Sequence, residues 1–123
     1  MRRDNKDLKW KETKQKVFQR DNNSCRLCRV LTAKEFMILK QHAGIYLSAM
    51  DPAHFLAVSS NPELCYDENN ICSLNHYSHS MLDDHKSPID GSYIKEDEVL
   101  YWWKRILKGN PQQYENLQHR GLV

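Results

Sequence analysis

NICSLNHYSHSMLD, at residues 70–83, is the stretch that decides the expected fold. Residues 71–74 form a short apolar run of the kind that builds a strand. Ser78 is a good helix N-cap, so a helix is expected from there through Asp84. The stretch is therefore expected to form a strand followed closely by a helix, with His79 in the first turn of that helix.

The side chains of this helix and of the earlier segment DPAHF, residues 51–55, suit phosphodiester chemistry. Hydrolysis of a phosphodiester needs a base that activates water and a divalent cation that stabilises the developing charge. His79 and Asp83 are four residues apart, so in a helix their Cβ atoms lie roughly 5–6 Å from each other and the pair can chelate one ion. His54 lies on the separate segment and can act as the base. Taken singly, His54 is more simply a structural histidine, and the pair a surface contact.

These residues resemble the HNH, or ββα-metal, endonuclease family, over about residues 10–83. In that family a histidine ends the first strand, an asparagine lies in the loop to the second strand, and a histidine opens the helix. The matching residues here are His54, Asn70 and His79, and the nine-residue step to His79 favours Asn70 over Asn69. The resemblance implies an α+β fold with a small ββα-metal (HNH or His-Me finger) core at about residues 45–85, flanked by helices.

The resemblance also implies the roles of the site residues. His54 would deprotonate water, Asn70 would tie down the loop and orient the base, and Mg²⁺ or Mn²⁺ would bind to His79 and Asp83. Asp51 would serve as a further metal ligand, directly or through water, because related nucleases carry an Asp-x-x-His pattern. The implied substrate is DNA, cleaved to 5′-phosphate and 3′-hydroxyl ends, as by nucleases of phages, mobile elements and restriction systems.

The chain departs from the family at the residue before the base. Many members carry Asp or His there as a metal ligand, whereas this chain has Ala53. This departure suggests an alternative, in which the domain is a catalytically decayed HNH scaffold that acts as a nucleic-acid-binding module.

A zinc site is the second metal site to consider. Cys25-Arg-Leu-Cys28 has the spacing of a zinc knuckle, although such a pair can also be redox-active or simply buried. Zinc-containing family members have a second Cys-x-x-Cys pair, which falls here on Asn75 and Ser78. The nearest remaining ligands for a structural zinc ion are Cys72, which could equally be a core residue, and His76. A purely structural zinc-knuckle protein is therefore a third interpretation.

Length and charge place further limits on the protein. A chain of 123 residues is expected to form a single domain, residues 1–123. No apolar run is long enough for a membrane span and the start lacks a secretion signal, so we expect an intracellular, cytoplasmic protein with no membrane partner. Residues 1–40 carry a net charge of +7 and residues 41–123 a net charge of −5. The basic third is expected either to contact DNA phosphates or to be a solvated helix.

Other elements follow from local signals. Thr32 and Glu35 form a capping box before a helix that Gly44 should end. The remaining expectations are a polar arm at residues 1–6, a basic helix at about 7–20, a strand at 45–50, a helix at about 93–108 and a flexible segment from 111 onward. Within the 93–108 helix, the aromatic residues 101–103 are expected to pack in the core rather than to stack on bases. His42, His85 and His119 are expected at the surface.

Overall fold

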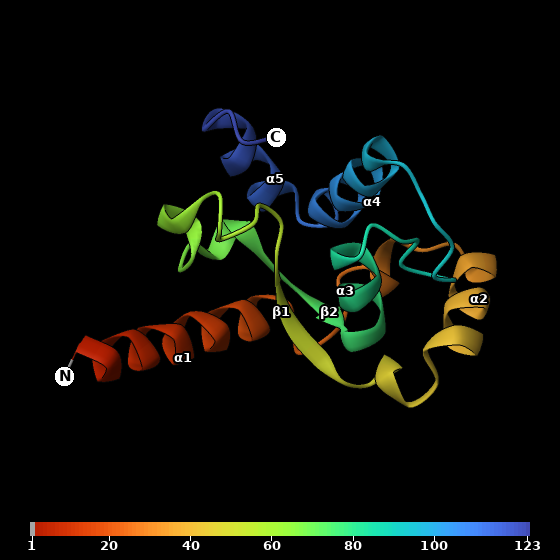
Figure 1. The fold of residues 1–123 in the computed structure, drawn as a ribbon, viewed down its shortest axis with the longest axis horizontal. Coiled ribbons are helices and arrows are strands. Elements are labelled where there is room, and N and C mark those ends of the chain that lie inside the picture. Colours follow the sequence, from red (N-terminus) through yellow and green to blue (C-terminus); the bar gives the residue numbers. More distant parts are fainter. Residues whose placement is uncertain (1) are drawn as a thin grey trace.

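Five α-helices and a two-stranded antiparallel sheet make up a mixed α+β fold in the computed structural model, which describes residues 2–123, with side chains from residue 8 onward (Figure 1). None of the described helices has the length and apolarity needed to cross a bilayer. The elements in chain order are α1 (Arg2–Arg20), η1 (Cys28–Val30), α2 (Ala33–Ala43), η2 (Gly44–Leu47), β1 (Met50–His54), η3 (Pro62–Leu64), η4 (Glu68–Asn70), β2 (Ile71–Asn75), α3 (His76–Asp83), α4 (Glu96–Lys108) and α5 (Pro111–His119).

The sheet pairs β1 with β2, from Met50 opposite Asn75 to His54 opposite Ile71. Pro52 is tolerated in β1 because it lies opposite Ser73, whose backbone N–H donates to a side chain outside the sheet, so that this pair makes no ladder hydrogen bond. Helix α3 follows β2 without a loop and contacts both strands. The order strand, strand, helix therefore brings the end of β1 close to the face of α3.

Two expected boundaries in this region are wrong. Residues 44–47 form the 3₁₀ helix η2 instead of a strand, and Ile45 and Tyr46 within it are exposed. The reason is Gly44, whose φ of 55° turns the chain after α2, so that the strand cannot start before Met50. The N-cap of α3 is Asn75 instead of Ser78, because the Asn75 side chain accepts a hydrogen bond from the backbone N–H of Ser78.

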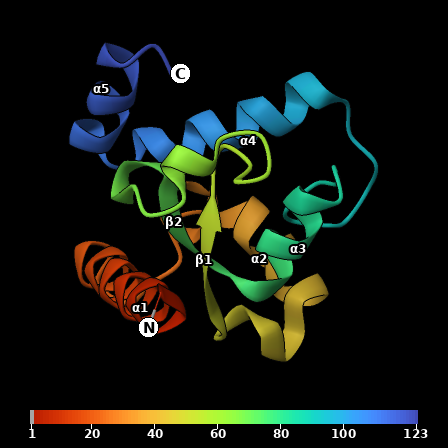
Figure 2. The same ribbon diagram turned by 60° about the vertical axis from the view of Figure 1, so that its left-hand side comes forward.

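The capping box is confirmed, whereas the helix expected at about 93–108 begins later, at Glu96. Both hydrogen bonds of the capping box between Thr32 and Glu35 are present at the start of α2. The basic helix begins earlier than expected, at Arg2, so the expected arm is part of α1, except Met1, which lies outside the described residues. Figure 2 shows α1 running beside β1.

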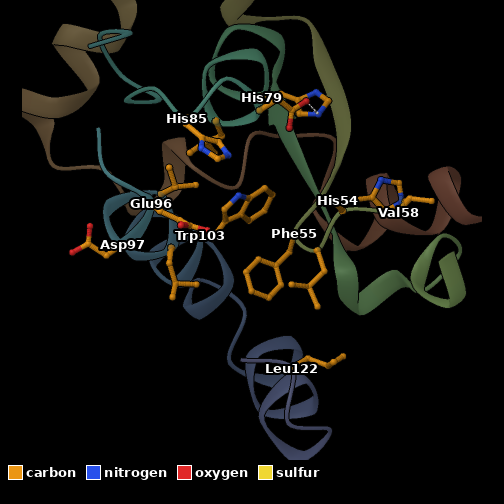
Figure 3. A pocket seen from close by; sticks show the side chains of 15 residues that line it. His54, Phe55, Val58, His79, His85, Glu96, Asp97, Trp103 and Leu122 are labelled. Carbon is orange, nitrogen blue, oxygen red and sulfur yellow. Dashed lines mark ion pairs between the residues drawn. The ribbon is translucent and has the colours of Figure 1, made fainter. Parts of the chain in front are cut away.

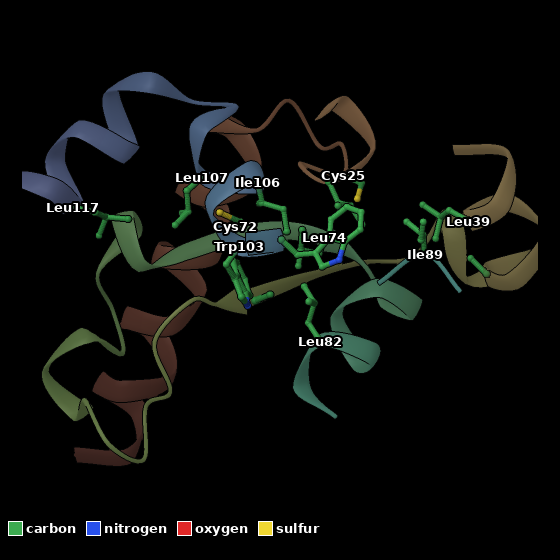
Figure 4. Packing of buried hydrophobic residues seen from close by; sticks show 14 residues of the cluster. Cys25, Leu39, Cys72, Leu74, Leu82, Ile89, Trp103, Ile106, Leu107 and Leu117 are labelled. Carbon is green, nitrogen blue, oxygen red and sulfur yellow. The ribbon is translucent and has the colours of Figure 1, made fainter. Parts of the chain in front are cut away.

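The core lies between the sheet and the surrounding helices (Figure 4). Trp102 and Trp103 are buried in α4, as expected, whereas Tyr101 is exposed, so the expectation that it packs in the core is wrong. Leu74 and Leu82 bring β2 and α3 into the same cluster. Burial of these apolar side chains holds α3 and α4 against the sheet.

The segment after residue 111 is ordered as α5, so the expectation of flexibility is wrong. Gln113 and Leu117, one turn apart, are both buried. The Gln113 side chain donates to the backbone oxygen of Asn69 at 2.8 Å and accepts from the Arg26 guanidinium at 2.7 Å. These bonds to distant parts of the chain, together with the burial of Leu117, hold α5 on the domain.

A buried carboxylate joins α1 to the sheet. Asp21 is fully buried and accepts hydrogen bonds from Arg26 at 3.1 Å and from both the backbone N–H and the hydroxyl of Ser73 at 3.0 Å. Burial alone would raise the pKa of Asp21, but these bonds and one from Arg20 lower it below 3.8. Asp21 thus sets the distance between the end of α1 and β2.

Candidate active site

The predicted base, His54, and two of the three predicted metal ligands, His79 and Asp83, line one cavity of about 890 Å³. His54 reaches it from the end of β1, and His79 and Asp83 reach it from α3. In Figure 3, His54 lies on the side of the cavity nearest α1, and the aromatic floor includes Phe55 and Trp103. The fold therefore brings His54, from one segment, to the same cavity as the His79–Asp83 pair from another.

His54 is held in one orientation by two contacts. Its Nε2 lies 2.9 Å from the backbone oxygen of Cys65. A carbonyl oxygen only accepts hydrogen bonds, so Nε2 carries a proton, and in the neutral form of the ring Nδ1 keeps its lone pair. The imidazole also stacks on the indole of Trp10, with ring centroids 5.6 Å apart and planes inclined by 15°. A neutral imidazole fixed in this way can accept a proton at Nδ1.

Asn70 closes the loop that follows His54. Its side chain is fully buried, and its Oδ1 accepts from the backbone N–H of Leu56 at 2.8 Å. Its Nδ2 donates to the backbone oxygens of Leu56 at 3.1 Å and Leu64 at 3.4 Å. Leu64 precedes Cys65, whose carbonyl holds His54. Asn70 thus fixes both ends of the loop that orients the imidazole.

Four side chains from β1 and α3 form a chain of polar contacts beside the cavity. Asp51 Oδ2 lies 2.9 Å from Nδ1 of His79 and 2.7 Å from Nδ1 of His76. The other ring nitrogen of His79, Nε2, lies 3.3 Å from Oδ2 of Asp83. Partial burial would raise the pKa of Asp51, but the hydrogen bonds from His79 and His76 lower it below 3.8. Asp51 is therefore a carboxylate that orients both imidazoles.

The donor set around His79 fits a divalent cation. Each ring nitrogen of His79 faces a carboxylate, and a neutral imidazole can donate only one hydrogen bond. With Nδ1–H donated to Asp51, Nε2 presents a lone pair toward Asp83, and a proton or a metal ion between them satisfies both. A histidine that ligates with one nitrogen and is held by a carboxylate through the other is the usual arrangement at metal sites.

The remaining ligands would have to come from water or substrate. Among the described residues, no three His, Cys, Asp or Glu side chains converge as a ready-made metal site. Ala53 is fully buried, so the position before the base offers nothing to an ion. Asp51, predicted as a metal ligand, lies on Nδ1 of His79, the side away from Asp83, and this places it behind His79 as the group that orients the ring. Sites for Mg²⁺ commonly use one or two protein ligands and several waters.

Three further residues belong to the site although their sequence patterns did not single them out. Trp10 lies on α1, and only the folded chain places its ring on His54. His85 and Glu96 also line the cavity. His85 is exposed, as expected, and has a positive φ of 58° after the end of α3. Neither lies in a pattern that indicates its role.

The structure does not bring the four predicted zinc ligands to one place, because Cys72 points away from Cys25 and Cys28. Asn75 and Ser78 face the knuckle: Asn75 Nδ2 lies 3.3 Å from Sγ of Cys25 and 2.9 Å from Oγ of Ser78. Cys72 lies three residues before Asn75, so strand alternation points it to the opposite face, where it contacts Gln113. His76 is held by Asp51. The set predicted for zinc, Cys25, Cys28, Cys72 and His76, is thus not brought together.

Comparisons of the chain with protein-family models, with curated proteins and with solved structures found no match.

Proposed function

We propose that this domain is a metal-dependent endonuclease of the HNH type, which hydrolyses phosphodiester bonds of DNA. The observation that carries this proposal is the shared cavity: an imidazole with a free Nδ1 lies on one element, and a His–carboxylate pair that fits a divalent cation lies on another. A base and a cation site around one space are the two parts that phosphodiester hydrolysis needs.

His54 would take a proton from the attacking water at Nδ1. The hydrogen bond from Nε2 to the Cys65 carbonyl would then stabilise the imidazolium that forms. The stack with Trp10 favours the same step, because a cationic ring over an indole face is stabilised by a cation–π interaction. Asn70 acts indirectly, because it holds the loop that carries Cys65.

His79 Nε2 and Asp83 would hold the ion, and Asp51 would keep His79 turned toward it through Nδ1. The bound Mg²⁺ or Mn²⁺ would stabilise negative charge on the scissile phosphate. Binding of the ion would replace the proton between Nε2 and Asp83. The proposal therefore predicts competition between protons and metal at this pair.

The basic helix α1 supports DNA as the substrate. Lys9, Lys11 and Lys16 are exposed along it, and Lys14 lies with its ammonium 5.7 Å from the ring centre of Trp10. Since Trp10 itself stacks on His54, these cations lie on the helix that flanks the base. Lysines in this place can hold the phosphates on either side of the scissile bond.

The direct test is cleavage of supercoiled plasmid in Mg²⁺ or Mn²⁺, beside a reaction with EDTA. We expect metal-dependent nicking that falls by about 10²–10⁴-fold in His54→Ala, the loss typical of a general base. His119→Ala is a matched control, because this exposed histidine lies on α5 outside the cavity. Activity that survives in His54→Ala would reject the assignment of the base.

A second candidate is a nucleic-acid-binding module on a scaffold that has lost catalysis. Ala53 favours it, because its fully buried methyl group leaves the ion with fewer protein ligands. This candidate predicts DNA binding that is unaffected by EDTA, without cleavage in any divalent cation. The same plasmid, used in a gel-shift experiment, separates the two functions.

A further inference from the structure

The sulfurs of Cys25 and Cys28 lie around a single amide group. Asn75 places its backbone N–H and its side-chain Nδ2 each 3.3 Å from Sγ of Cys25, and the same Nδ2 is 3.9 Å from Sγ of Cys28. Cys25 is 5% exposed and Cys28 is half-buried. A tight turn and the end of β2 thus hold two thiols side by side in a largely closed space.

This environment suits one thiolate and one thiol. Two donors point at the Cys25 sulfur, the backbone N–H and the side-chain Nδ2 of Asn75, and the Cys28 thiol lies against the same Nδ2. The Cys28 hydrogen bond, followed by those from Asn75, outweighs burial and lowers the pKa of Cys25 to about 6. The same contact raises the pKa of Cys28, which keeps its proton. A thiolate beside a protonated thiol is the arrangement of a dithiol that can be oxidised.

The same contacts disfavour zinc at this position. A zinc ion on two thiolates needs two further lone pairs, and the groups that face the sulfurs present hydrogens. The amide oxygen of Asn75 is turned away, because it accepts the backbone N–H of Ser78 at 2.8 Å. The hydroxyl of Ser78 donates to the carbonyl of Pro88 at 2.7 Å. Hydrogen-bond donors, and not further metal ligands, therefore surround the sulfurs of Cys25 and Cys28.

We propose that Cys25 and Cys28 are a redox modification site, at which a hydroperoxide converts the dithiol into an intramolecular disulfide. The Cys25 thiolate attacks one peroxide oxygen and the O–O bond breaks, so Cys25 becomes a sulfenic acid while the leaving hydroxide or alkoxide takes a proton from solvent to become water or alcohol. The Cys28 sulfur then attacks the Cys25 sulfur and displaces water, which takes the proton of Cys28. Two electrons pass from the two sulfurs to the peroxide. A small oxidant suits a sulfur that is only 5% exposed.

Oxidation would alter the start of α3. The disulfide removes the negative charge that accepts both N–H groups of Asn75, and Asn75 is the N-cap of α3. Among the described residues, Cys25 Sγ is the acceptor for the backbone N–H of Asn75, so loss of the thiolate charge is expected to make hydrogen exchange at this N–H at least about tenfold faster.

The test uses the whole reduced protein and hydrogen peroxide, with denaturing alkylation and peptide mapping, and it involves no DNA. We expect a Cys25–Cys28 disulfide, while Cys65 and Cys72 stay reduced and are therefore alkylated. The rate of disulfide formation should rise as the pH increases through about 6. Cys28→Ser should stop at a sulfenic acid on Cys25 that a dimedone probe traps, and Cys25→Ser should leave Cys28 reduced.

Asn75→Asp provides the matched variant, because aspartate keeps the N-cap of α3 but replaces the side-chain donor with a carboxylate. It should move the pH midpoint of the reaction upward by about one unit or more. Oxidation of Cys25 no faster than that of Cys65, or equimolar zinc that protects both knuckle thiols, would overturn the proposal. Neither outcome depends on whether the domain cleaves DNA.

Discussion

Replacement of Asp51 by asparagine tests the arrangement of the candidate cation site. Asp51 Oδ2 lies 2.9 Å from Nδ1 of His79, and Nε2 of the same ring faces Asp83. The geometry thus makes Asp51 the group that orients a ligand, and Asp83 a ligand itself. Asp51→Asn keeps the size of the side chain. It removes the negative charge, which fixes the His79 ring and makes His79 a more basic ligand.

The expected loss follows from these separate roles. Removing the partner that orients a metal-bound histidine typically lowers metal affinity by about 10–100-fold. That range corresponds to about 1.4–2.7 kcal/mol of binding free energy, which matches the loss of one hydrogen bond to a charged group, about 1.5–3 kcal/mol. Asp83→Asn removes a ligand, so its loss should be larger than that of Asp51→Asn.

Calorimetric titration of Mn²⁺ into the parent and the variants measures these affinities. Asp84→Asn is the matched control, because Asp84 is an exposed carboxylate next to Asp83, at the C-cap of α3. This variant should leave the Mn²⁺ affinity within about twofold of the parent. The reasoning is refuted if Asp51→Asn abolishes binding while Asp83→Asn leaves it intact, because the ion would then lie on the strand side of His79.

Three other predictions follow from contacts outside the cation site. Leu117→Ala should lower the free energy of unfolding by about 2–5 kcal/mol in urea denaturation, because this fully buried side chain anchors α5; a change below about 0.5 kcal/mol would mean that α5 is not part of the cooperative core. Glu35 accepts two hydrogen bonds from Arg105, and this contact lowers the pKa of Glu35 from 4.5 to about 2 despite burial. The ionised Glu35 therefore stabilises the fold fully above pH 4.5, and this stabilisation is lost as the pH falls toward 2. Glu35→Gln should therefore cost about 1–2 kcal/mol at pH 6, after allowance for partial exposure, and much less at pH 2.5; a cost equal at both pH values would contradict this. Neutralising Lys11 and Lys14 together should weaken DNA binding for all sequences alike and reduce the slope of log affinity against log salt by roughly one unit per contact, and an unchanged slope would remove α1 from the interface.

Short-range signals predicted those parts of the fold that short-range interactions make. The capping box of Thr32 and Glu35 forms within four residues, and β2 and α3 follow directly from residues 70–83. Helix α5 shows the opposite case. Its polar sequence gives a weak apolar pattern, and its place depends on the bonds of Gln113 to Asn69 and Arg26, which are 44 and 87 residues away. Such contacts leave no trace in local periodicity.

The candidate site divides in the same way. The spacing of His79 and Asp83 on one helix face was predictable, and so was the separate position of His54. The stack of Trp10 on His54 was not, because it joins α1 to the end of β1 across the fold. Strand alternation also bears on the predicted zinc ligands: Cys72 and Asn75 are an odd number of residues apart in β2, so their side chains face opposite sides of the strand.

The position of Trp10 links substrate binding to the proposed base. His54 is held from one side by the loop that Asn70 closes and from the other by the ring of Trp10 on α1. The lysines that would bind phosphates lie on the same helix as Trp10, within one or two turns of it. A rigid helix that carries both a phosphate contact and the surface against which the imidazole stacks sets the distance from a bound backbone to Nδ1 of His54. In the proposed function α1 therefore supplies positive charge and also sets the distance between the bound phosphates and the base. Shortening α1 before Trp10 should affect DNA affinity more than the orientation of His54.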